Sequence, residues 1–173
     1  LPVRSRVFVA GGAGHAGFHI IQALLERHPD MRITASYHRY REPFVDDPRV
    51  RYVRADLTSI RDCRKAIRGC DAAIMAAAYS GGSRFIRKHP WEHAMRNLMM
   101  SLTMLGCFAA NGIKKTVYVG SATLYQPGSH KMREVDLDLS KDPPAAYYGF
   151  GWVCGYLEEV CRFLSRRTGK RVM

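Results

Sequence analysis

The sequence predicts an α/β protein with an open, doubly wound parallel β-sheet between two layers of helices. Short β-rich segments alternate along the chain with segments that carry apolar residues at helical spacing. This alternation is typical of parallel strands joined by right-handed crossovers. A turn with three evenly spaced glycines follows the first β-rich segment, and no internal repeat interrupts the pattern.

Five segments are predicted to form strands, because each is short, β-rich and bounded by glycine, proline or charged residues. They are residues 6–10, 32–37, 50–55, 71–78 and 115–121. The final letters, "KRVM", resemble the start of a further strand. Since the chain begins with Leu1 and ends within this stretch, we expect residues 1–173 to be one domain at the N-terminal end of a longer protein.

Four segments between these strands have the apolar spacing of helices. They are residues 16–28, 59–68, 91–111 and 148–167. Residues 122–146 have neither pattern, and an irregular segment of that length in a compact domain is more often functional than not.

The composition indicates a protein of the reducing cytoplasm with no membrane span. No apolar run reaches the roughly 18 residues that a span requires. The five cysteines lack a C-x-x-C pair, which indicates free thiols and neither a disulfide framework nor a zinc site. They are Cys63, Cys70, Cys107, Cys154 and Cys161.

The net charge of +12, from 27 Lys and Arg against 15 Asp and Glu, is typical of a protein with an anionic ligand. The basic residues are spread over several segments and no nucleic-acid-binding motif accompanies them. We therefore expect a solvated basic surface or a nucleotide-type ligand, and no nucleic-acid partner.

The stretch "VFVAGGAGHAGFHII" places Gly11, Gly14 and Gly17 where the first strand meets a helix. The first glycine permits a tight turn, the second lets a pyrophosphate approach the backbone, and the third lets the helix pack on the strand. The N–H groups of the helix N-terminus favour the negative charge of such a ligand. With His15 and Ala16 between them, these glycines form the predicted phosphate-binding turn.

The spacing G-x-x-G-x-x-G and four later pieces together resemble the extended short-chain dehydrogenase/reductase family. This family comprises nucleotide-sugar epimerases, dehydratases and reductases of the NAD-dependent epimerase/dehydratase type. The pieces are "ADL" (55–57), "AAA" (76–78), "NLMMSLTMLGCFAANGIKKTVYVGSATLYQ" (97–126) and "PPAAYYGFG" (143–151). The resemblance implies a Rossmann fold, a dinucleotide cofactor and a nucleotide-sugar substrate, with a C-terminal substrate lobe that this chain lacks.

The resemblance also implies the residues that contact the cofactor. Asp56 and Leu57 match the pair at the adenine, although a helix cap is the alternative for Asp56. Ala76, Ala77 and Ala78 match the small residues against which the cofactor lies. Asn97 matches a residue whose amide supports the active-site backbone, and an exposed polar helix position is the alternative reading.

The end of the second strand bears on the choice of coenzyme. An NAD enzyme usually carries Asp or Glu there, about 20 residues past the glycines, to hold the ribose 2′-hydroxyl. This chain has Ser36, Tyr37, His38, Arg39, Tyr40 and Arg41 at that place. With no carboxylate to repel a 2′-phosphate and with Arg39 and Arg41 able to bind one, NADP is favoured. NAD remains the alternative.

The family's catalytic positions map onto the second half of the chain. Ser121 matches the serine that holds the sugar hydroxyl, and Thr123 matches a second substrate-contacting position. Tyr148 matches the tyrosine acid/base, with Tyr147 as the neighbouring alternative. Ala122 and Thr123 stand where dehydratases carry an acidic pair, which disfavours a dehydratase.

One catalytic position departs from the family, because Trp152 stands four residues after Tyr148 where a lysine is expected. Lysine would favour the tyrosinate and bind ribose hydroxyls, whereas indole offers one neutral donor and no charge. Another cation, such as Lys131 or Lys141, is one explanation. A chain that binds the dinucleotide as a sensor or scaffold is a second, and an error in the alignment of Tyr148 is a third.

Two further expectations follow from the resemblance. The segment 77–101 is similar to the GDP-sugar branch, which includes GDP-fucose synthase. The helices 91–111 and 148–167 are apolar around most of their circumference, which requires burial on a second face. In the family these two helices build an intersubunit bundle, so a homodimer is expected; core packing alone is the alternative.

Overall fold

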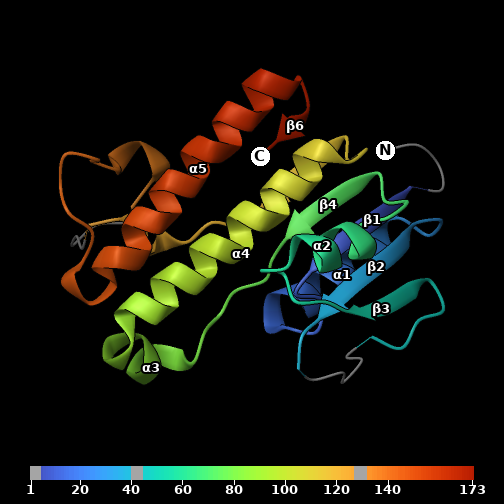
Figure 1. The fold of residues 1–173 in the computed structure, drawn as a ribbon, viewed down its shortest axis with the longest axis horizontal. Coiled ribbons are helices and arrows are strands. Elements are labelled where there is room, and N and C mark those ends of the chain that lie inside the picture. The colour runs from blue at the N-terminus through green and yellow to red at the C-terminus, as the bar shows by residue number, and fades with distance from the viewer. Residues whose placement is uncertain (1–4, 40–44, 127–131) are drawn as a thin grey trace.

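A computed structural model of the chain describes residues 5–39, 45–126 and 132–173. The described residues form one parallel sheet of six strands in the order β3-β2-β1-β4-β5-β6 (Figure 1). The strands are β1 (Arg6–Ala10), β2 (Arg32–Tyr37), β3 (Val50–Arg54), β4 (Ala72–Met75), β5 (Lys115–Tyr118) and β6 (Arg171–Val172). The predicted doubly wound sheet is confirmed.

The helices among the described residues are α1 (His15–Arg27), α2 (Ile60–Ala66), α3 (Gly82–Lys88), α4 (Pro90–Ala110) and α5 (Tyr148–Thr168). Three short 3₁₀ turns lie in or beside the segment predicted to be irregular, namely η1 (Ala122–Leu124), η2 (Glu134–Asp136) and η3 (Ala145–Tyr147). The pattern did not predict α3, a seven-residue helix that buries none of its residues and therefore has no apolar stripe.

Two predicted strands are too long at their carboxyl ends. β4 ends at Met75 and not at residue 78, and β5 ends at Tyr118 and not at residue 121. The residues beyond these ends are apolar or small, like those of a strand, but they leave the sheet where it turns toward the candidate site. Composition alone does not mark that boundary.

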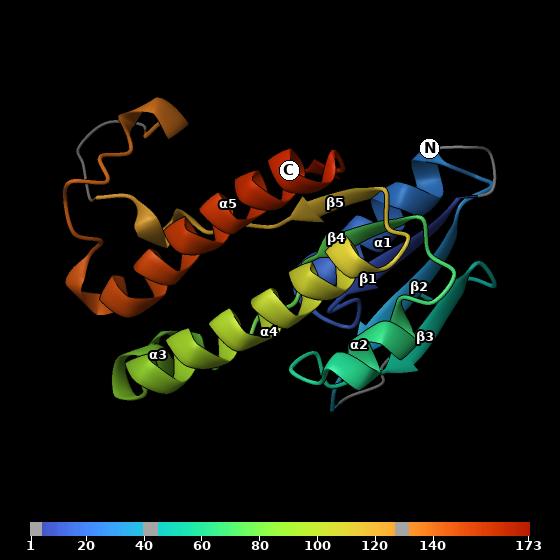
Figure 2. The ribbon, with the colours of Figure 1, turned by 45° about the horizontal axis from the view of Figure 1, so that its top comes forward.

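The central strand β1 is buried on both faces, because its alternate residues enter two separate cores. Val7 and Val9 pack with Ile21 and Leu25 of α1. Phe8 enters the core formed with α2, α4 and α5, where its ring lies edge-on to Phe108 with centroids 6.2 Å apart. Figure 2 shows α1 on one face of the sheet and α2 and α4 on the other. A parallel sheet covered in this way needs near-continuous apolar strands.

The strand order reverses direction between β1 and β4, since the chain builds outward through β2 and β3 on one side and through β5 and β6 on the other. In open α/β sheets, ligands bind outside the carboxyl ends of the strands at this switch point. The turn after β1 and the segment after β4 therefore meet where a ligand is expected.

All five cysteines are buried and free, in agreement with the prediction that they form no disulfide framework. Across the described ranges, no helix combines the length and the apolar character that crossing a membrane would take.

Candidate functional site

The glycine turn after β1 is closed so tightly that side chains do not fit at two of its predicted positions. Gly11 has φ +77°, and a Cβ there would lie 2.7 Å from the Cα of Ala77 beyond β4. A Cβ on Gly17 would lie 2.2 Å from the carbonyl oxygen of Gly11. These contacts are with backbone atoms, which cannot rotate away. The turn thus brings the start of α1 against the strand as the motif requires.

Two further residues hold this turn and were missed by the sequence analysis. A Cβ on Gly12 would lie 2.5 Å from the Cβ of Ala35 in β2. The buried hydroxyl of Ser36 accepts a hydrogen bond from the N–H of Gly11 at 3.0 Å. The adjacent glycines at 11 and 12 were a visible signal for the first contact. The second joins residues 25 positions apart and had no local signal.

The N-terminus of α1 is left available for an anion. Gly14 is the N-cap, and its N–H donates to the carbonyl of Gly11 at 2.9 Å. The first turn has no capping side chain and no acidic residue. The first N–H groups of a helix have no intrahelical acceptor, so the exposed His15 and Ala16 lie where these groups favour negative charge. The turn fits the pyrophosphate of a dinucleotide.

At the carboxyl end of β3, Asp56 is exposed while Leu57 is buried. One carboxylate oxygen of Asp56 accepts the hydroxyl and the main-chain N–H of Thr58, at 2.7 Å and 2.9 Å. These two hydrogen bonds lower the pKa of Asp56, with smaller contributions from His38 and Arg96. Ser59, not Asp56, caps α2 by accepting the N–H of Asp62. The helix-cap reading of Asp56 is therefore wrong.

Ala76, Ala77 and Ala78 follow β4 and run beside the glycine turn. The next residue is fixed by Asn97 of α4, whose side-chain oxygen accepts the N–H of Tyr79 at 2.8 Å and whose amide donates to its carbonyl at 2.9 Å. Asn97 also donates to the carbonyl of His93 and is only 4% exposed. The reading of Asn97 as an exposed polar position is wrong, and its amide supports the backbone after the alanines.

At the end of β2, the hydroxyl of Ser36 is already bonded to the glycine turn, so a side chain that reaches the ribose must come from farther along. His38 and Arg39 are both exposed there. Tyr40 and Arg41 lie outside the described residues. Arg39 is thus the described arginine of the predicted coenzyme-selecting segment.

At the carboxyl end of β5, Ser121 and Thr123 come together. Their hydroxyl oxygens are 3.1 Å apart, and Ser121 also accepts the N–H of Thr123 as the cap of η1. The buried thiol of Cys154 in α5 contacts both side chains. Burial raises the pKa of this thiol to about 11, against the opposing effect of hydrogen bonds to Thr123 and Ser121. Cys154 is a supporting residue that the sequence analysis treated only as a free thiol.

Tyr148 is the first residue of α5 and is 52% exposed, whereas Tyr147 is half-buried in η3. Trp152 is one turn along the same helix and is partly buried. Of the two lysines considered as substitutes, Lys131 lies outside the described residues. Lys141 pairs with Asp138 at 3.0 Å, so its ammonium group already has an anionic partner.

The helix that carries Tyr148 is packed closely against the segment that carries Ser121. A Cβ on Gly151 would lie 2.9 Å from the carbonyl oxygen of Thr123, and one on Gly155 would lie 3.2 Å from the side chain of Leu124. On another side of α5, Phe150 lies against the buried ring of His93, with centroids 4.4 Å apart. These contacts fix the start of α5 relative to both η1 and α4.

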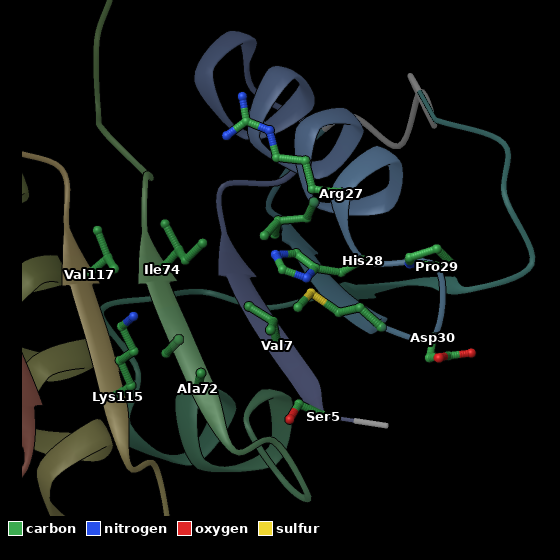
Figure 3. Close-up of a pocket in the computed structure, with 13 residues that line it drawn as sticks. Ser5, Val7, Arg27, His28, Pro29, Asp30, Ala72, Ile74, Lys115 and Val117 are labelled. Carbon is green, nitrogen blue, oxygen red and sulfur yellow. The ribbon is translucent and has the colours of Figure 1, made fainter. Parts of the chain in front are cut away.

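Of two large cavities that border the sheet in the described part of the chain, one adjoins the predicted site. A cavity of about 600 Å³ at the carboxyl end of β5 is bordered by Ser121, Tyr125 and Glu158. A cavity of about 450 Å³ lies at the opposite, amino ends of the strands, below the end of α1 (Figure 3). Its floor of Val7, Ile74 and Val117 is apolar, and none of the predicted site residues lines it.

Comparisons with known proteins agree with this geometry. The profile of the NAD dependent epimerase/dehydratase family matches residues 7–159. The chain is 27% identical over 168 residues to GDP-mannose 3,5-epimerase 1 of Oryza sativa subsp. japonica, an alignment that covers 95% of this chain and 43% of the relative. The chain therefore spans less than half the length of that curated relative.

Two solved structures share the fold over nearly the whole chain. A GDP-mannoheptose C4 reductase from Campylobacter jejuni with NADP bound has a TM-score of 0.78 at 18% identity, covering 100% of this chain and 51% of that one. A UDP-glucose 4-epimerase from Thermus thermophilus in complex with NAD has a TM-score of 0.76 at 22% identity, covering 96% and 53%.

Proposed function

The chain belongs to the NAD dependent epimerase/dehydratase family, and we propose on that basis that it binds a nicotinamide dinucleotide as part of a nucleotide-sugar epimerase or reductase. The observation that carries the proposal is the glycine turn, which is closed around Gly11 and Gly17 and leads into a helix N-terminus without a capping side chain. Calorimetric titration at low ionic strength tests it. We expect heat of binding with NADP or NAD, and none with either would refute the proposal.

NADP is the proposed coenzyme. Support comes from the absence of a carboxylate between Ser36 and Arg39 and from the exposed arginine that ends this stretch. The relatives include one structure with NADP bound and another with NAD. The ratio of the dissociation constant for NADP to that for NAD therefore decides this part of the proposal: it should be below one in the wild type and should rise in Arg39→Ala, because this variant loses affinity for NADP alone.

The proposed binding residues divide between the two halves of the dinucleotide. The pyrophosphate would be bound by the turn formed by Gly11, Gly14, His15, Ala16 and Gly17. The adenosine half would be bound by Asp56, Leu57 and Arg39, and the backbone of Ala76, Ala77 and Ala78 would lie along the cofactor. When bound, the nicotinamide supplies or accepts a hydride at a sugar carbon.

The chain's own catalytic groups would act on the sugar hydroxyl. Ser121 orients that hydroxyl, with Thr123 as a second contact whose own hydroxyl is close to it. Tyr148 exchanges the hydroxyl proton, and its exposure leaves it accessible to a substrate. Trp152 brings no positive charge to favour the tyrosinate, so proton transfer by Tyr148 requires a cation from elsewhere or proceeds slowly.

The rival function is a dinucleotide-binding regulator or scaffold without turnover. The observation in its favour is the pairing of Lys141 with Asp138, which occupies the described substitute cation. Incubating the protein with NADPH or NADP and candidate GDP- or UDP-sugars, and following the absorbance of the reduced nicotinamide, separates the two. Binding without hydride transfer would refute the enzyme and favour the regulator.

The substrate is proposed to be a nucleotide sugar, since the relatives' names include GDP-mannose, GDP-mannoheptose and UDP-glucose. Two of these three carry GDP, which supports the GDP-sugar branch. Residues 1–173 would form the dinucleotide-binding domain of a longer cytoplasmic protein, with a substrate lobe supplied by a further segment. Sequencing the parent reading frame tests this part.

A homodimer through α4 and α5 is proposed from the apolar side chains that these helices expose. They are Trp91, Met99 and Leu102 on α4, and Tyr156 and Phe163 on α5. Burial of such side chains against a second copy would remove apolar surface from water. Light scattering should give a dimer mass for the wild type and a monomer mass for Met99→Glu. Ile60→Glu, at an equally exposed residue of α2, is the control and should remain dimeric.

A further inference from the structure

Arg96 of α4 is a cation that the predicted site does not include. Its Nε is 3.1 Å from an oxygen of Glu92, and its guanidinium carbon is 4.7 Å from the centre of the Tyr79 ring. The hydroxyl of Tyr79 donates to the same oxygen of Glu92 at 3.0 Å. Three side chains thus contact one another pairwise. Although the side chain of Arg96 is 51% exposed, these contacts fix its orientation.

This group lies at the edge of the dinucleotide site. Tyr79 directly follows Ala78, and Asn97 holds its main chain in place. Arg96 also directly precedes Asn97 on α4, and its charge is the smallest of the influences that lower the pKa of Asp56 at the end of β3. In Figure 1 the first turns of α4 extend past the carboxyl end of β4.

The chemistry of the group favours an aromatic ligand over a phosphate. The ion pair with Glu92 offsets the charge of Arg96, which weakens its attraction for an anion. Its guanidinium is planar, and with Tyr79 on one face it is partly open to solvent elsewhere. A planar guanidinium stacks on aromatic rings, which an ammonium group cannot do in the same way. Asp56 and Leu57 would contact the edge of a bound adenine and leave a face to be covered.

We propose that Arg96 binds the adenine ring of the dinucleotide by stacking its guanidinium on the base, with Tyr79 supporting the guanidinium. This inference rests on the proposed function. It adds a binding residue that acts on the adenosine half whichever coenzyme is used. It therefore affects ADP, NAD and NADP alike.

The test is calorimetric titration of the wild type and three variants with ADP, NAD and NADP. Arg96→Ala should weaken all three ligands about tenfold, as expected for loss of a stacking contact. Arg96→Lys keeps the charge and the reach to Glu92 but not the planar group, and should lose nearly as much. Arg166→Ala removes the same charge from an exposed position near the end of α5 and should bind all three like the wild type.

Four results would overturn the inference, and the last of them would also overturn the proposed function. Wild-type affinity in Arg96→Lys would mean that the charge or the ion pair matters and stacking does not. A loss confined to NADP would mean that Arg96 contacts the 2′-phosphate. Unchanged binding by Arg96→Ala would remove Arg96 from the site while the proposed function stands. Failure of the wild type to bind any of the three ligands would overturn the proposed function together with this inference.

Discussion

The two ends of the predicted site are built to different degrees of completeness. At the β1–α1 turn, a Cβ added to Gly11, Gly12 or Gly17 would lie less than 3 Å from a neighbouring atom. All three glycines of the predicted phosphate-binding turn are present there. At the β5–α5 end, Ser121, Thr123 and Tyr148 are present but Trp152 stands where a cation is expected. If the proposed function holds, this comparison predicts that dinucleotide binding and turnover can be altered separately in this chain.

The physical reason for the difference is that the two ends rely on different interactions. The binding turn depends on backbone N–H groups and close packing, which leave no freedom for side-chain replacement. Proton transfer at the other end, as proposed, would depend on the charge beside one tyrosine, and Trp152 brings no charge although α5 packs closely on η1. Mutations at the two ends should therefore have different kinds of effect.

The largest effect is expected at the binding turn. Gly17→Ala places a Cβ 2.2 Å from the carbonyl oxygen of Gly11, a clash that only a backbone shift can relieve. We expect a loss of about 3 kcal/mol in the free energy of unfolding, measured by urea denaturation. Gly112→Ala, at a glycine with open space around it, should change it by less than about 0.5 kcal/mol. Equal stability of the two variants would show that the turn is not tightly closed.

The next effect concerns the catalytic end. Trp152→Lys restores a positive charge one turn after Tyr148 and should raise the rate of hydride transfer to a nucleotide sugar at least about a hundredfold, the lower range for general acid–base catalysis. The readout is the absorbance of the reduced nicotinamide, and Trp152→Gln controls for loss of the indole without gain of charge. If both variants behave alike, the missing charge is not what limits turnover.

A smaller effect is expected where α4 supports the binding end. Asn97→Ala leaves the N–H and the carbonyl of Tyr79 without their partner, which should cost about 2 kcal/mol in the free energy of unfolding. Asn111→Ala removes a single bond to the carbonyl of Cys107 and should cost less than about 1 kcal/mol. Thermal unfolding monitored by circular dichroism measures both. A smaller loss in Asn97→Ala than in Asn111→Ala would contradict the role assigned to Asn97.

The smallest effect is on acid stability, through two carboxylates whose pKa is strongly lowered and which are not among the predicted site residues. Hydrogen bonds from Arg49 lower the pKa of Asp47 to about 2, and those from Ser140 and Lys141 lower the pKa of Asp138 to about 2. A pKa depressed by folding stabilises the protein above the unfolded value near 3.8, and this stability is lost as the pH falls toward 2.

Asp47→Asn and Asp138→Asn should each flatten the fall in stability between about pH 4 and pH 2. Because Arg49 also donates to the carbonyls of Leu25 and Pro29, we expect Asp47→Asn to have the larger effect. Among the described residues, the side chain of Asp138 bonds with Ser140 and Lys141 of its own loop. Denaturant unfolding at several pH values measures the difference, and a steeper fall in either variant would reverse the assigned sign.

The sequence predicted the fold class and the elements because these depend on local patterns. The alternation of β-rich and amphipathic segments was sufficient for β1, β2 and the long helices, whose ends are within one residue of the prediction. The short helix α3 was missed because none of its residues is buried. The predicted bounds of β4 and β5 extended too far because the residues after both strands have a strand-like composition.

The sequence by itself also determined the glycine turn and the presence of Trp152 four residues after Tyr148, since both are read from spacing along one element. Only the tertiary structure decided that Ser36 holds Gly11, that Asn97 holds Tyr79, that Cys154 contacts Ser121 and Thr123, and that Arg96 lies over the ring of Tyr79. Each of these contacts joins segments that are distant in the chain. Their geometry follows from how the sheet and helices pack, which no local pattern encodes.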